Sequence, residues 1–160
     1  MSVSLSTALR NAMMDGGSGK GFKGALEDGI IEVFTAPRPA NADAAETGTK
    51  LLRITVASGA FVAGTGTNGL SLGTPSGGAV AKASEVWSGV GLANGVANWY
   101  RYYSNAALTG AETAFDHTAT KVRMDGSCAT SGSQLNMSNT NVVLNATTTI
   151  DSASFSLPAS

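Results

Sequence analysis

Charge is scarce in this chain of 160 residues. Only 13% of its residues are charged, against roughly 25% in an average soluble domain. Ten basic and eleven acidic side chains give a formal net charge of −1, which argues against binding to nucleic acid by phosphate neutralisation. A surface with little charge is typical of a protein that lies packed against other proteins, because surfaces that face solvent carry more charge.

Cysteine, histidine and long apolar runs are scarce as well. The single cysteine, Cys128, excludes an internal disulfide and a cysteine-rich zinc site. With His117 as the only histidine, the chain has no clustered ligand set, so we predict neither a metal nor a cofactor. No apolar run reaches the ~18 residues of a membrane-spanning helix. Residues 1–6 lack the features of a signal peptide, so we expect the protein to stay in the cytoplasm until it joins an assembly.

Glycine, threonine, serine and asparagine take the place of the missing charges. Twenty glycines disfavour long helices, and β-branched threonine favours strands. Alternating apolar residues and turn signals predict strands at 30–35, 52–56, 96–103, 122–125, 135–137, 142–144 and 147–157, with the last two paired across Asn145-Ala146 and a turn at Asp125-Gly126. This spacing predicts a mainly β, single-domain fold, a β-sandwich or jelly roll with a short N-terminal α-helix.

The first residues give the one clear helical signal. Leu5, Leu9 and Met13 form an apolar stripe, with Ser4 or Ser6 as the N-cap. We therefore divide the chain into an N-terminal helical arm at 1–21 and a β-sandwich domain at 22–160. Two interpretations remain open: the helix caps the sandwich of its own chain, or the arm lays these three side chains into the groove of a neighbour.

The segment Trp99-Tyr100-Arg101-Tyr102-Tyr103 is the most distinctive part of the sequence. Tyr100 and Tyr102 would share one face of a strand, with Trp99 and Tyr103 on the other. A core strand is the favoured interpretation. The alternatives are a platform on which sugars or bases stack, and a strand with one face in the core and the other in a protein interface.

Known catalytic patterns fail at identifiable positions. The glycine-rich stretch at 16–21 has no preceding strand, and no hydroxyl residue follows Lys20, so it does not fit a phosphate-binding loop. His117 and Cys128 lack the strained nucleophile turn of a hydrolase. We therefore predict that the protein is not an enzyme, and a hydrolase using His117 is the weakest of three hypotheses.

Several motifs together resemble a group of structural proteins of tailed bacteriophages. They are Leu-Arg-Asn-Ala-Met-Met at 9–14, Gly-Ile-Ile-Glu-Val-Phe at 29–34, Pro-Arg-Pro-Ala-Asn-Ala-Asp-Ala-Ala at 37–45, Thr-Gly-Thr at 47–49, Val-Trp-Ser-Gly-Val-Gly at 86–91, Val-Arg-Met-Asp-Gly at 122–126 and Thr-Ile-Asp at 149–151. The resemblance implies a virion component, and no functional residue is carried over with it.

Within that resemblance, the first expectation is a capsid decoration (cement) protein on the outer surface of the head. Its partners would be the major capsid protein and copies of itself in a homo-oligomer, with no nucleic acid and no membrane. The residues expected to make contacts are Leu5, Leu9, Met13, Trp99, Tyr100, Tyr102 and Tyr103. A tail-associated protein fits the same motifs. The alternative function is a carbohydrate-binding adhesion module on the head or tail, which would bind a surface glycan through the aromatic strand.

Overall fold

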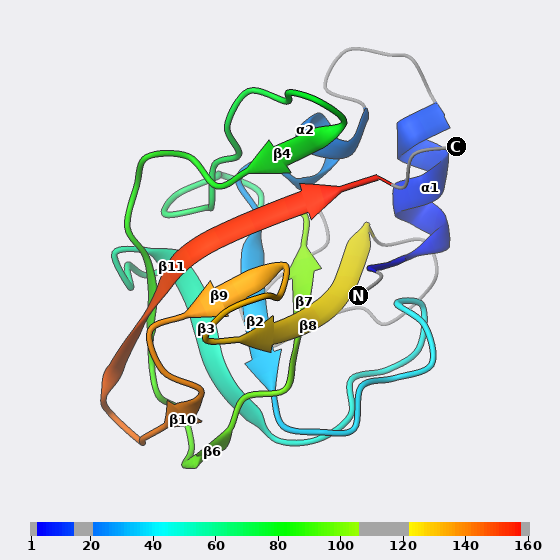
Figure 1. Cartoon of the computed structure of the whole chain (residues 1–160). Helices are drawn as coiled ribbons and strands as arrows, with labels where there is room; N and C mark the ends of the chain where they lie inside the picture. The colour runs from blue at the N-terminus through cyan, green and yellow to red at the C-terminus, as the bar shows by residue number, and fades with distance from the viewer. Residues whose placement is uncertain (1–2, 15–20, 106–121, 158–160) are drawn as a thin grey trace.

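The computed structural model describes residues 3–14, 21–105 and 122–157, and most of its regular structure is strand (Figure 1). The two helices are α1 (Thr7–Met14) and α2 (Gly21–Leu26). The strands are β1 (Ser4–Leu5), β2 (Ile30–Phe34), β3 (Lys50–Val56), β4 (Ala79–Ala81), β5 (Trp87–Val90), β6 (Gly95–Val96), β7 (Trp99–Tyr103), β8 (Arg123–Ala129), β9 (Leu135–Met137), β10 (Asn141–Val142) and β11 (Thr147–Ser156).

Seven of these strands close into a barrel, in the order β8-β7-β2-β3-β5-β11-β9. Strand β9 completes the ring because it pairs with β11 on one side and, in parallel, with β8 on the other. The remaining neighbours in the ring are antiparallel. The prediction of a β-sandwich or jelly roll is therefore wrong. The physical reason is that β9 joins the two strands that would otherwise be sheet edges, and closure satisfies their main-chain hydrogen bonds.

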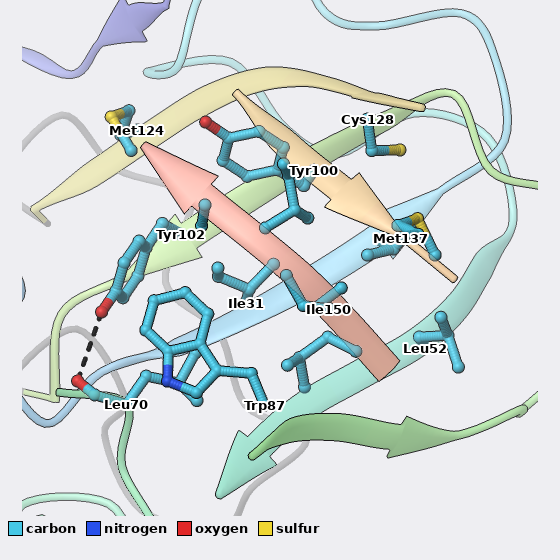
Figure 2. Close-up of a cluster of buried hydrophobic side chains, with 14 of the residues drawn as sticks. Ile31, Leu52, Leu70, Trp87, Tyr100, Tyr102, Met124, Cys128, Met137 and Ile150 are labelled. Carbon is cyan, nitrogen blue, oxygen red and sulfur yellow. Dashed lines mark hydrogen bonds between the residues drawn. The ribbon is translucent and has the colours of Figure 1, made fainter. Parts of the chain in front are cut away.

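The barrel interior is packed with side chains. Alternate residues of each strand point inward, and Figure 2 shows Ile31, Trp87, Tyr102 and Ile150 meeting there from four different strands. The Tyr102 hydroxyl finds its partner across the interior, where it donates to the Leu70 carbonyl at 3.3 Å. A ring of this size encloses a core without a channel.

Several predicted strands are confirmed, notably those at 30–35, 52–56 and 135–137, but the segment 96–103 is divided. Val96 pairs with Asn141 of β10, whereas β7 pairs with β2 and β8. The chain changes partners between them, at residues 97 and 98. The predicted pairing of 142–144 with 147–157 is also wrong, because β10 pairs with β6. Strand β11 pairs with β4, β5 and β9 instead.

The predicted turn at Asp125-Gly126 is a further correction, since both residues lie inside β8. Gly126 faces Tyr100 across the β7–β8 pair. A Cβ atom at position 126 would overlap the Tyr100 hydroxyl and lie 2.6 Å from two of its ring carbons. The glycine is needed because an aromatic ring occupies the space that a side chain would fill.

The N-terminal helix lies against its own barrel. The Ser6 hydroxyl accepts a hydrogen bond from the Leu9 amide at 3.2 Å, so Ser6 is the N-cap. Leu9 is fully buried in the core cluster, and Leu5 and Met13 pack against that cluster while partly buried. Strand β1 adds to the sheet beside β8. These contacts support the capping interpretation, while the glycine-rich stretch up to residue 20 lies outside the described residues.

Candidate protein-binding surface

The four aromatic residues that we predicted to make contacts are all buried, two inside the barrel and two outside its wall. Tyr100 and Tyr102 point into the barrel, and Trp99 and Tyr103 lie on its outer wall beneath the segment 35–49. There the Trp99 indole donates to the Thr35 carbonyl at 2.9 Å, and the Tyr103 hydroxyl donates to the Glu46 carboxylate. None of the four is more than 1% exposed. The interpretation of this strand as core is confirmed, and the strand presents no stacking platform.

The same outer wall holds charged side chains that sequence patterns did not reveal. Arg101 donates to both carboxylate oxygens of Asp125, at 2.6 and 2.8 Å, and to the carbonyl of Ala44 at 2.8 Å. Arg123 donates to the carbonyl of Asp43 at 3.3 Å. Alternating residues on β7 and β8 place these side chains on one face, where the segment 35–49 covers them.

Glu32 of β2 extends this set of charges. Lys50 lies 2.8 Å and Arg53 3.2 Å from its carboxylate oxygens. Burial raises the pKa of Glu32, and the two cations oppose that shift. We define the buried charge network as Glu32, Arg101, Arg123 and Asp125, all with 0% exposure. Its carboxylates are paired with cations and buried, which leaves no access for a substrate.

The candidate chemical groups give no reactive centre in the described structure. Cys128 is buried, and burial raises the pKa of its thiol to about 12, so the thiol is protonated and inert at neutral pH. Lys20 and His117 lie outside the described residues. Within the described ranges, no three His, Cys, Asp or Glu side chains are grouped to hold a metal ion. No helix in that part of the chain is long and apolar enough to cross a membrane.

Exposed aliphatic side chains instead gather on two hydrogen-bonded segments, 90–96 and 141–147. β6 pairs with β10, and the Gly91 amide donates to the Ala146 carbonyl at 2.8 Å. Both segments lie at the end of the barrel marked by β6 and β10 in Figure 1. We call this surface the uncharged end. Its exposed aliphatic residues are Val90, Leu92, Val96, Val143 and Leu144, between 42% and 59% exposed.

The two segments come from stretches of sequence without any formal charge. Neither residues 86–100 nor residues 126–150 contain Asp, Glu, Lys, Arg or His. The exposed polar side chains beside the aliphatic ones include four asparagines, Asn94, Asn98, Asn141 and Asn145. These charge-free stretches are the sequence signal that could have located the surface. Covering such a surface requires no ion to leave water, which removes the largest cost of burial.

One hollow borders the uncharged end, and another lies beside β7 and β8. The Arg38 hollow has a volume of about 540 Å³ and is lined by Arg38, Asn98, Trp99, Ser127, Cys128, Ala129 and Ser133. The Arg53 hollow has a volume of about 170 Å³, and its lining includes Arg53 together with Val90 and Leu92 of the uncharged end. The Arg53 hollow therefore places one arginine beside the aliphatic surface.

Comparison of the chain with protein-family models, curated proteins and solved structures finds no match. Functional inference therefore depends on the surface itself. That surface combines exposed aliphatic side chains and neutral amides with one bordering arginine, Arg53, a composition found in protein interfaces. The structure brings none of the predicted contact residues into it. Trp99, Tyr100, Tyr102, Tyr103 and Leu9 are buried in the core, and Leu5 and Met13 pack partly buried against it.

Proposed function

We propose that this chain is a non-enzymatic structural protein that binds another protein through the uncharged end of its barrel. Its resemblance to structural proteins of tailed phages provides the context. In that context it is a decoration protein that attaches to the outside of the head and stabilises the shell. The observation that carries the proposal is the exposure of five aliphatic side chains on segments that contain no charge.

The energetic scale of this surface suits reversible attachment. Full burial of a Val or Leu side chain is worth about 1.5–3 kcal/mol. Since these side chains are already about half covered, a partner that covers the rest would gain roughly 1 kcal/mol from each. Binding that occurs only on the assembled shell stabilises the shell by mass action.

The carbohydrate-binding alternative receives no support from the aromatic strand. Sugar-binding platforms present aromatic faces to solvent, whereas Trp99, Tyr100 and Tyr102 are buried. The hydrolase hypothesis likewise finds no activated thiol, because Cys128 is buried and protonated. A protein contact is the function that the described surface supports best.

The direct test is binding to head shells of the phage that encodes the chain, purified without this protein. Val96→Asp places a charge in the uncharged end, and Val86→Asp is a matched control because the two valines are 59% and 58% exposed and Val86 lies at the opposite end of β5. We expect wild type and Val86→Asp to bind and to raise the temperature at which shells rupture. Val96→Asp should bind at least a hundredfold more weakly.

Two outcomes would contradict the proposal. One is the absence of binding by the wild-type protein, and the other is equal binding by the two variants. Mass spectrometry of intact particles supplies an independent measure of location, because decoration predicts a copy number comparable with that of the major capsid protein. A handful of copies would indicate a tail or vertex protein.

A further inference from the structure

Strand β6 has an outer edge whose main-chain groups point away from its partner, β10. In the antiparallel ribbon of these two strands, Val96 lies opposite Asn141. The next residue, Ala97, donates its amide hydrogen to the Thr140 carbonyl at 2.8 Å. Opposed residues of an antiparallel pair alternate between hydrogen-bonded and non-hydrogen-bonded positions, so Val96 and Asn141 form a non-hydrogen-bonded pair. The main-chain N–H and C=O groups of both residues therefore point outward from the ribbon.

The outer edge of β10 is occupied by its own chain. The Asn141 amide donates to the side-chain carbonyl of Asn139 at 2.9 Å. A little further along, the Val143 carbonyl accepts from the Ala146 amide at 3.0 Å. Within the described ranges, no such partner meets the outward N–H and C=O of Val96, a residue that is 59% exposed. Of the two edges of this ribbon, the edge of β6 is therefore the one that offers an unpaired donor and acceptor.

The sequence around β6 lacks the residues that protect an exposed edge. Natural proteins protect edge strands with lysine, with other charged side chains or with proline. Residues 86–100 contain no charged residue and no proline. The remaining protection is the length of the strand, because an edge of two residues pairs with a short segment and is no template for a long one. This edge is therefore suited to a local, specific contact.

We propose that the partner of the uncharged end contributes an extended segment that adds as a strand to the outer edge of β6, with its main chain hydrogen-bonded to Val96. This inference rests on the proposed function and specifies how the partner binds. An extended main chain presents N–H and C=O groups to an adjacent edge, whereas those of a helix are bonded within the helix.

The same position defines the side chain that the partner brings. The residue beside Val96 shares a face with an exposed aliphatic side chain, so an aliphatic or β-branched residue fits there. An ion at that place would lose water and find no counter-ion in residues 86–100. The partner segment is therefore an extended, uncharged stretch with an aliphatic residue at its centre.

Substitutions at position 96 test the main-chain contact through affinity for the same shells. Val96→Pro removes the outward N–H, and proline is accommodated where the N–H of an edge strand faces solvent. We expect Val96→Pro to bind about tenfold more weakly, the effect of one lost hydrogen bond. Val96→Ile keeps the amide and a β-branched aliphatic side chain, so it is the matched control and should bind like wild type. Equal affinities of the two variants would contradict strand addition.

Hydrogen exchange provides a second measurement that needs no variant. In the free protein the Val96 amide should exchange rapidly, whereas the Ala97 amide, which is bonded to Thr140, should exchange slowly. Binding to shells should slow exchange at Val96 by about tenfold or more. A Val96 amide that exchanges as fast on the shell as in solution would overturn the inference, and this result decides the matter if Val96→Pro does not fold.

The outcomes separate this inference from the proposed function. If the wild type binds shells while Val96→Pro binds like Val96→Ile and the Val96 amide stays exchangeable, strand addition is wrong and the proposed function stands. If the wild type does not bind, both are wrong. A dimer of the isolated protein in sedimentation, dissociated by Val96→Pro, would assign the edge to a second copy and overturn the inference.

Discussion

Two regions of the molecule reverse the usual distribution of charge: the uncharged end, and the outer wall that the segment 35–49 covers. In the wall, the four residues of the buried charge network are completely covered. At the end of the barrel, Leu92, Val96 and Val143 are each more than half exposed. Proteins generally bury aliphatic side chains and expose ionised ones, so both regions depart from the rule.

The difference shows where the few charged residues of this chain are used. Arg101 and Arg123 donate hydrogen bonds to the Ala44 and Asp43 carbonyls, which favours one placement of the segment 35–49 over the wall, because a displaced segment would leave buried donors unsatisfied. The exposed end carries no charge and can be covered by another protein without removing an ion from water. One region is suited to contacts within the chain, and the other to contacts outside it.

The largest expected effect is on the wall. Asp125→Ala removes the carboxylate that pairs with the buried Arg101 and leaves only Glu46, 4.0 Å away, as a counter-ion, which should lower the free energy of unfolding by about 3–5 kcal/mol. Urea unfolding measures the change. Asp151→Ala, at an exposed position of β11, is the control and should change stability by less than about 0.5 kcal/mol. Equal effects of the two variants would show that the network does not stabilise the fold.

Alkaline pH should destabilise the wall and the core together. Burial raises the pKa of the Cys128 thiol to about 12 and raises the pKa of the Tyr100, Tyr102 and Tyr103 hydroxyls above their usual value. The unfolded chain releases these protons first, near its ordinary pKa values, so stability is complete below pH ~8 and falls as the pH rises.

We expect a loss of about 2–3 kcal/mol by pH ~10, measured as urea unfolding across this range. Cys128→Ala should remove part of the loss, since alanine does not titrate. A free energy of unfolding that stays constant between pH ~8 and pH ~10 would mean that these groups are accessible to water in the folded protein.

A smaller effect is expected from filling the space beside Tyr100. Gly126→Ala should cost about 1–3 kcal/mol because its Cβ would meet the Tyr100 ring and hydroxyl. Tyr100→Phe alone removes a buried hydroxyl that has no partner in the described structure, so it should be nearly neutral. In the double variant the cost should be less than the sum of the two, and additive costs would place the clash elsewhere.

The smallest effect on stability is expected at the uncharged end. Val96→Asp and Val143→Asp replace side chains that are mostly exposed, so each should change the free energy of unfolding by less than about 0.5 kcal/mol. Thermal unfolding provides the measurement. A large loss of stability would show that these valines support the barrel, which would remove the distinction between the two regions.

Local patterns in the sequence predicted much of the secondary structure. Alternation located β3 and β11, and β-branched and aromatic residues located β2. The spacing of Leu9 and Met13 located α1, but Leu5, which we assigned to the same helical stripe, lies in strand β1. Barrel closure could not be predicted, because it depends on the three-residue strand β9 finding both β8 and β11. No periodicity in the sequence specifies which distant strands pair.

The candidate surface was only partly accessible to sequence reasoning. Low overall charge led us to look for protein contacts, and the sequence pointed to the aromatic strand as their place. Trp99 and Tyr103 are buried because the segment 35–49, distant in sequence, covers their face of the barrel. Asp125 was predicted to lie in a turn because its partner, Arg101, is far away in sequence. The charge-free stretches at 86–100 and 126–150 were a better guide to exposed aliphatic residues, since all five of those at the uncharged end lie in them.

Hydroxyl-radical footprinting of the protein, free and bound to head shells, tests the central claim most directly. The account predicts that binding protects residues 90–96 and 141–147. Residues 79–86, which precede β5 in the chain, should remain as reactive as in the free protein. Protection of residues 79–86 or of α1, with Leu92, Val96 and Val143 still reactive, would contradict it.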